Sequence, residues 1–174
     1  LESSFDRIWT LLVRSESNST RPGQTPTNYW LAVIDIDHFK QVNDAHGHML
    51  GDEILLLVSR LMSSSFRASD LLYRYGGEEF VAIIAAENDA IARNVFERVR
   101  LAIEAHTFPR VDKLTISIGY SRADPNLLPL EVLGRADRSL YQAKNDGRNR
   151  VYSYEELAAA GIFKDIDYGD LELF

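Results

Sequence analysis

The sequence contains no cysteine among its 174 residues. That absence excludes disulfides, a thiolate nucleophile and zinc–thiolate centres. Long hydrophobic runs are also missing, because no stretch approaches the roughly 20 apolar residues that a membrane-spanning helix requires, and no secretory signal is visible. The first residue is Leu1 rather than Met, so we expect a fragment of a longer protein.

Positive charge is scarce. Lys and Arg total 19 against 26 Asp and Glu, which gives a formal net charge of -7. This balance excludes broad binding to a nucleic acid polymer, which requires a basic face. It does not exclude a nucleotide held through a metal ion, because the ion supplies the positive charge locally.

The remaining composition is that of a globular protein, with 45% hydrophobic and 26% charged residues. Periodicity predicts helices at 5–12, 54–62, 92–103 and 132–143, and strands at 29–34, 71–75, 80–84, 114–120 and 151–154. A loop is expected at 15–28, and Gly76-Gly77 is a hairpin signal because both glycines can adopt positive φ. The predicted fold class is α/β: an α+β sandwich whose mostly antiparallel central sheet is flanked by helices, with no second domain.

Acidic residues follow two of the expected strands. Asp35 and Asp37 end the strand at 29–34, and Glu78 and Glu79 follow the Gly-Gly turn. If these strands are neighbours, Asp35 and Glu78 converge, and clustered carboxylates repel unless a cation lies between them. Oxygen ligands favour magnesium or manganese. The alternative is structural: such acids are commonly solvated, Asp37 is favoured as a cap of the following helix, and Asp52 is placed to cap the helix at 54–62.

Three ordered motifs between residues 31 and 151 carry a resemblance to a known family. They are Asp35-Ile36-Asp37-His38-Phe39-Lys40 with Asn43-Asp44, Gly47-His48 and Gly51-Asp52; Arg74-Tyr75-Gly76-Gly77-Glu78-Glu79-Phe80; and Ala136-Asp137, Leu140-Tyr141, Ala143-Lys144 and Gly147-Arg148-Asn149. Together they resemble GGDEF domains, the catalytic domains of diguanylate cyclases, in the Gly-Gly-Glu-Glu-Phe form. The resemblance implies a fold related to nucleotide-cyclase and polymerase-palm domains, covering residues 1–154 and truncated at its N-terminus. It leaves residues 155–174 as an acidic tail without a catalytic role.

The resemblance also implies a metal centre. The side chains of Asp35 and Glu78 and the carbonyl of Ile36 would bind Mg²⁺, or alternatively Mn²⁺, with two ions per site. Such ions polarise the α-phosphate and help to generate the attacking 3′-oxygen. Either Glu78 or Glu79 would assist deprotonation of that hydroxyl, and the sequence leaves the choice between them open.

Roles toward GTP are implied in the same way. Asn43 and Asp52 would recognise guanine, since a carboxylate accepts from N1–H and the exocyclic amine together and adenine lacks that pair. The remaining implied substrate residues are His48, Gly76, Gly77 and the phosphate-binding Lys40, Lys144 and Arg148, of which Lys40 is also expected to act in catalysis. Taken alone, each basic residue would be interpreted as solvated surface.

A second ligand site is implied by Arg67 and Asp70, an Arg-x-x-Asp that ends just before the hairpin. Arg binds phosphate or the guanine Hoogsteen edge in a bidentate manner, and Asp accepts from the Watson–Crick edge. Arg98 is a candidate second arm. The hypothesis is feedback inhibition by cyclic di-GMP, and the alternative is a surface Arg with a helix-terminal Asp.

The function implied is condensation of two GTP into cyclic di-GMP with release of two pyrophosphates. One domain would bind one GTP, so a second copy of the domain is required. An upstream sensory or dimerisation module and a cytoplasmic location, in a protein that is either soluble or membrane-anchored, are expected. The competing hypotheses are a non-catalytic cyclic di-GMP receptor and a GTP-binding regulatory domain.

Overall fold

The computed structural model describes residues 28–163. The helix expected at 5–12 and nearly all of the loop expected at 15–28 lie outside this range. Within the described residues, no helix combines the length and the apolar character needed to cross a membrane.

The centre of the fold is a five-stranded sheet in the order β2-β3-β1-β4-β5. Its middle strand, β1 (Asn28–Ile36), pairs antiparallel with β3 (Glu79–Ala86) and with β4 (Ile116–Arg122). β2 (Leu71–Gly76) joins β3 antiparallel, and the short β5 (Val151–Ser153) joins β4 in parallel. The prediction of a mostly antiparallel sheet, with an edge strand after residue 150, is therefore confirmed.

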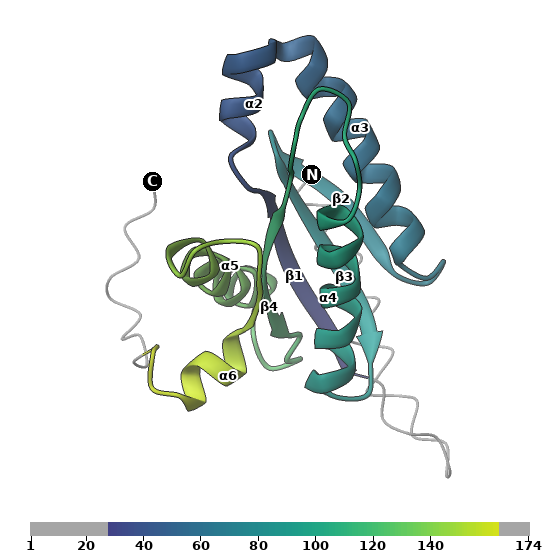
Figure 1. The fold of residues 1–174 in the computed structure, drawn as a ribbon. Coiled ribbons are helices and arrows are strands. Elements are labelled where there is room, and N and C mark those ends of the chain that lie inside the picture. The colour runs from purple at the N-terminus through teal and green to yellow at the C-terminus, as the bar shows by residue number, and fades with distance from the viewer. Residues whose placement is uncertain (1–27, 164–174) are drawn as a thin grey trace.

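Helices cover both faces of this sheet (Figure 1). α3 (His48–Ser65) and α4 (Asp89–Glu104) lie on one side, and α5 (Pro129–Asn145) and the short α6 (Tyr154–Ala159) lie on the other. α2 (Phe39–His46) follows β1 directly. The α+β sandwich expected from the sequence is confirmed.

Alternation along β1 divides the core into two parts. Trp30, Ala32 and Ile34 belong to the large cluster beneath α3 and α4, whereas Leu31 and Val33 belong to a smaller cluster beneath α5. Because successive side chains of a strand point to opposite faces, the odd-numbered residues that follow, Asp35 and Asp37, are directed to the α5 side. The alternation along β1 that buries the core residues therefore also determines the face of the sheet on which the carboxylates lie.

A glycine in β4 lets α5 approach the sheet closely. A Cβ at Gly119 would lie 2.0 Å from the backbone nitrogen of Leu140 and 2.2 Å from the carbonyl oxygen of Ala136. Both atoms belong to the backbone of α5, so no side-chain rotation could relieve the overlap. This contact sets the position of α5, whose last turn carries Lys144.

The acidic segment expected as a tail from Glu155 onward begins as a helix. Ser153 caps α6, its hydroxyl accepting from the backbone N–H of Glu156, and Leu157 is buried. The carboxylate of Glu155 accepts from the hydroxyl of Ser121 at 2.8 Å. Six residues are too few to show a helical period, which explains why the sequence pattern did not indicate α6.

Candidate active site

Three acids meet where β1 ends beside the β2–β3 hairpin. Asp35 lies directly opposite Glu79 in the β1–β3 pairing. The backbone N–H of the next residue, Ile36, is 3.4 Å from the carbonyl oxygen of Glu78. The convergence of Asp35 and Glu78 predicted from the sequence is thus observed at the level of the backbone, with Ile36 between them.

Lys144, in the last turn of α5, contacts this cluster of acids. Nζ of Lys144 is 2.9 Å from Oδ2 of Asp35, and the Asp35 side chain is only 8% exposed. Burial raises the pKa of Asp35 above its ordinary value, although the hydrogen bond and the charge of Lys144 act in the opposite direction. The pKa of Glu78 is also raised, first by burial and then by the negative charge of Asp35. Both carboxylates therefore lie where a neighbouring cation is favourable.

The donor set suits a hard cation that keeps part of its own coordination shell. Among residues 28–163, no three or more His, Asp or Glu side chains form a ready-made metal cage. Mg²⁺ is typically held by one or two carboxylates and completes its octahedron with water and substrate phosphates. Asp35 and Glu78, with the carbonyl of Ile36 beside them, fit that requirement.

Asp37 does not cap the following helix, contrary to the prediction. The N-cap of α2 is His38, in the left-handed region with φ 60°, and it makes no side-chain capping bond. The buried carboxylate of Asp37 instead accepts from the hydroxyls of Thr115 and Ser117, each at 2.7 Å, and from the backbone N–H of Asn149 at 3.1 Å. Asp37 therefore joins the end of β1 to the start of β4 and to the segment after α5.

Asp52 is not a helix cap either. α3 begins at His48 with Gly47 as its N-cap, so Asp52 lies inside the helix with an exposed side chain. A Cβ at Gly51 would lie 1.9 Å from Oδ1 of Asn43, which places the amide of Asn43 against α3 beside Asp52. Asn43 thus contacts α3 at the position that precedes Asp52 in the sequence. His48, in the first turn of α3, is exposed.

The hairpin turn is shifted by one residue from the expected one. Gly76 pairs with Glu79, so the two residues between the strands are Gly77 and Glu78. Gly76 and Gly77 are not among the glycines with positive φ. Arg74 braces the turn instead, because Nε and Nη2 donate to the carbonyl of Gly77 at 3.0 and 2.6 Å. No role for Arg74 was predicted from the sequence, although it stands within the hairpin motif.

The basic residues expected to bind phosphate come from two places. Lys144 and Arg148 lie in and just after the last turn of α5, and the charge of each acts on Asp35. Arg148 also lines a pocket of about 530 Å³ together with His38, Gln41 and Thr115. Lys40 is exposed on α2 and makes no hydrogen bond or ion pair within the described chain.

The Arg67–Asp70 segment forms a compact turn between α3 and β2. The backbone N–H of Arg67 donates to Oδ2 of Asp70 at 2.8 Å, and the N–H of Asp70 donates to the carbonyl of Arg67 at 3.0 Å. Arg98 of α4 donates from Nη2 to the carbonyl of Ser65 at 2.7 Å, at the end of α3. The three residues predicted for the product site therefore gather around the end of α3.

Comparison with known proteins decides the family. The model of the diguanylate cyclase GGDEF domain matches residues 11–150. The chain belongs to the GGDEF domain family. Diguanylate cyclase DgcZ of Escherichia coli is 40% identical over 135 residues, which make up 75% of this chain and 45% of that protein.

Solved structures agree with this assignment. The GGDEF domain of DgcB from Caulobacter crescentus, in complex with c-di-GMP, is 31% identical with a TM-score of 0.75, and the match covers 88% of each chain. The active GGEEF domain of a diguanylate cyclase from Vibrio cholerae is 29% identical with a TM-score of 0.71, covering 85% of this chain and 94% of that one. The present chain spans less than half the length of the curated relative DgcZ.

Proposed function

We propose that this GGDEF domain is a diguanylate cyclase, which condenses two GTP into cyclic di-GMP and releases two pyrophosphates. The observation that carries the proposal is the buried Asp35 at the end of β1, beside Glu78 of the hairpin and 2.9 Å from Lys144. Family membership and the curated diguanylate cyclases among its relatives support it.

Asp35 and Glu78 would hold Mg²⁺ by their side chains and Ile36 by its carbonyl, with Mn²⁺ as an alternative and two ions per site. When bound, the metal supplies Lewis-acid activation of the α-phosphate and of the attacking 3′-oxygen. The raised pKa values of Asp35 and Glu78 support this assignment, because a metal ion relieves the cost of ionising both.

The basic side chains would hold the triphosphate. Lys144 and Arg148 are near Asp35, and Lys40 projects from α2 in the segment that follows β1. Their charges would offset the negative charge that develops as pyrophosphate leaves. Gly76 and Gly77 carry no side chain that could block the nucleotide, and Glu78 or Glu79 would accept the proton of the 3′-hydroxyl.

Guanine would lie between α2 and α3. The Asp52 carboxylate would accept from N1–H and the exocyclic amine, the Asn43 amide would contact the same base, and His48 would stand at the edge of the site. The contact of Asn43 with Gly51 supports this arrangement, because it holds the amide beside Asp52. Adenine presents no equivalent donor pair, so selection against it should be strong.

Catalysis would require a second copy of the domain. With one GTP in each domain, each 3′-oxygen attacks the α-phosphate of the other GTP across a two-fold axis. An upstream sensory or dimerisation module in the complete protein would control how often the two domains meet in this orientation, which is a large lever on rate. Cyclic di-GMP bound by Arg67, Asp70 and Arg98 would inhibit the reaction, and the gathering of these residues at the end of α3 supports that role.

The experiment is a product assay on the 174-residue chain fused to a dimerising coiled coil. Supplied with GTP and Mg²⁺, the dimer should release cyclic di-GMP and pyrophosphate, and ATP should give no product. Asp52→Asn should lose this discrimination, whereas Glu53→Gln, which neutralises the next exposed carboxylate of α3, should retain it. Retained GTP binding without product would overturn the proposal in favour of a regulatory GTP-binding domain.

A further inference from the structure

The segment that joins α5 to β5, residues 146–150, has an unusual backbone. Arg148 and Asn149 are consecutive and both left-handed, with φ of 64° and 49°. Residues other than glycine avoid this region because Cβ crowds the backbone, and they remain there only where surrounding contacts hold them. The contacts that hold this segment therefore decide how Arg148 is presented.

Asn149 makes the contacts that fix the segment from the inside. Its Nδ2 donates to Oε1 of Glu104 at 2.8 Å, and its Oδ1 accepts from Nη1 of Arg100 at 2.8 Å. Its backbone N–H donates to the buried Asp37 at 3.1 Å. Arg100 and Glu104 are themselves paired at 2.7 Å, and the Arg100 side chain is 13% exposed. Asn149 is thus held by a charged pair on one side and by a buried carboxylate on the other.

These partners belong to the opposite layer of the fold. Arg100 and Glu104 lie on α4, on the other side of the sheet from α5 (Figure 1). The side chain of Asn149 therefore ties the segment after α5 to α4, which covers the other face of the sheet. A helix of the opposite layer thereby helps to hold the segment in its left-handed conformation.

Arg148 itself is held mainly through its backbone. Its N–H donates to the carbonyl of Ala143 at 2.9 Å, and its carbonyl accepts from Nε of Arg150 at 2.9 Å. The guanidinium makes only a 3.4 Å contact with the carbonyl of Lys144. The direction of this side chain therefore follows from the backbone conformation that Asn149 maintains.

We propose that Asn149 is a positioning residue for nucleotide phosphate: by clamping the left-handed segment to Arg100 and Glu104, it directs Arg148 toward the phosphates. The inference rests on the proposed function, in which Arg148 binds phosphate. Asparagine meets both demands of the position. It tolerates left-handed backbone better than most residues, and its amide offers one donor to Glu104 and one acceptor to Arg100.

A double-mutant cycle on MgGTP binding tests the proposal. Calorimetry on the 174-residue chain should show that Asn149→Ala weakens MgGTP binding about tenfold, which corresponds to about 1.4 kcal/mol. In an Arg148→Ala background the same substitution should have almost no further effect, because Asn149 acts through Arg148. Asn149→Gly should bind as weakly as Asn149→Ala, since it permits the backbone conformation without holding it.

A rescue and a control separate positioning from general loss of structure. Asn149→Asp combined with Glu104→Gln reverses donor and acceptor, and it should restore most of the affinity that Asn149→Asp alone loses. Gln142→Ala removes a 2.9 Å hydrogen bond to Asp146 on the outer side of the same segment and should leave MgGTP affinity unchanged. In the dimerised chain, at a temperature where both variants are fully folded, KM for GTP should rise more in Asn149→Ala than in Gln142→Ala.

The outcomes distinguish this inference from the proposed function. Additive effects of Asn149→Ala and Arg148→Ala, or unchanged MgGTP affinity in Asn149→Ala with only a lower melting temperature, would overturn the positioning role. MgGTP binding with the expected coupling but no cyclic di-GMP from the dimer would overturn the proposed function and support the positioning role. Absence of MgGTP binding by the parent chain would overturn both.

Discussion

Replacing Gly119 by Ala should destabilise the domain and disturb the candidate active site together. The added Cβ would lie 2.0 Å from the backbone nitrogen of Leu140, and ordinary van der Waals contact begins near 3.4 Å, so α5 must retreat by about 1.4 Å. Overpacking of this kind typically costs about 1–3 kcal/mol. A backbone contact lies at the upper end of that range, so we expect about 2–3 kcal/mol.

The same movement should weaken the contact between Lys144 and Asp35. Lys144 is one helical turn beyond Leu140, and its Nζ is 2.9 Å from Asp35. A retreat of α5 by about 1.4 Å would break this hydrogen-bonding distance unless the side chain compensates. Gly119→Ala should therefore lower MgGTP affinity of the folded protein as well as its stability.

Urea unfolding followed by circular dichroism measures the loss of stability, and the control is Gly134→Ala in α5. A Cβ at Gly134 meets no atom within 4 Å apart from its chain neighbours and the nearby backbone of α5 itself, and Ala is favoured over Gly in a helix by about 1 kcal/mol. Gly134→Ala should thus be at least as stable as the parent chain. If Gly119→Ala unfolds at the same urea concentration as Gly134→Ala, the packing argument is refuted.

Three further predictions concern the surroundings of the site. The amide of Asn149, followed by Arg100 and Lys113, holds the pKa of Glu104 below its ordinary value. The ionised Glu104 and its partners therefore stabilise the fold fully above the ordinary carboxyl pKa, and this stabilisation is lost as pH falls through the lowered pKa of Glu104. Asn149→Ala should therefore cost about 1 kcal/mol in urea unfolding at pH 7 and less near pH 3, and an equal cost at both would contradict this. The added Cβ of Gly51→Ala meets the side chain of Asn43 and lies 3.3 Å from the ring of Phe39, but it meets no backbone atom. Calorimetry should therefore show MgGTP affinity reduced about tenfold, with a smaller loss of melting temperature than in Gly119→Ala. Asp37→Ala leaves two hydroxyls and one N–H without their buried acceptor and should cost about 3 kcal/mol in the same unfolding assay.

Periodicity in the sequence was sufficient to predict the strands of the sheet, although not the order in which they pair. The apolar run at 29–34 indicated the middle strand β1, and the alternation along 114–120 indicated its neighbour β4, which is observed two residues later at Ile116–Arg122. The convergence of Asp35 and Glu78 was expected only if the strand and the hairpin are neighbours, and the pairing of β1 with β3 meets that condition. Such patterns succeed because burying one face of a strand or helix is a local requirement that each residue satisfies by its own polarity.

Features that depend on long-range hydrogen bonds were not accessible in this way. Asp37 was predicted to cap a helix because it precedes one in the sequence. The groups that donate to its carboxylate belong to Thr115, Ser117 and Asn149, which are remote in sequence, so no local pattern reveals them. The cap assigned to Asp52 was wrong because α3 begins four residues earlier, at His48. A helix start without a capping side chain carries no polar signal that a sequence could display.

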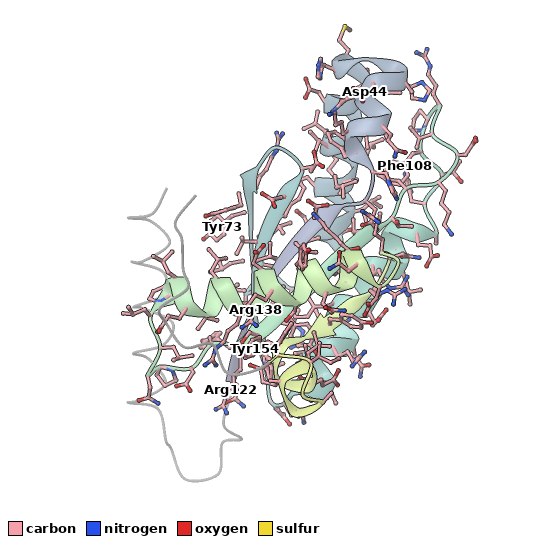
Figure 2. All side chains as sticks on the ribbon, turned by 90° about the vertical axis from the view of Figure 1, so that its left-hand side faces the viewer. Asp44, Tyr73, Phe108, Arg122, Arg138 and Tyr154 are labelled. Carbon is pink, nitrogen blue, oxygen red and sulfur yellow. The ribbon has the colours of Figure 1, made fainter. Side chains whose placement is uncertain are left out.

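The tertiary contacts of charged side chains could not be predicted from the sequence either. Arg135 and Arg138 of α5 would each be interpreted as solvated, yet their guanidinium groups lie over the rings of Tyr154 and Phe163, at 5.0 and 4.6 Å from the ring centroids. Figure 2 shows Arg138 and Tyr154 close together, where α6 folds against α5. The Arg side chains thus help to attach α6, and only the folded structure reveals it.

The most direct test of the central claim is the rate of cyclic di-GMP formation by the dimerised chain when one carboxylate is neutralised. Glu78→Gln should abolish product while leaving the melting temperature close to that of the parent. Glu87→Gln, at an exposed position beyond the far end of β3, should form product at the parental rate. Undiminished turnover in Glu78→Gln would contradict the assignment of the Asp35–Glu78 pair as the reaction centre.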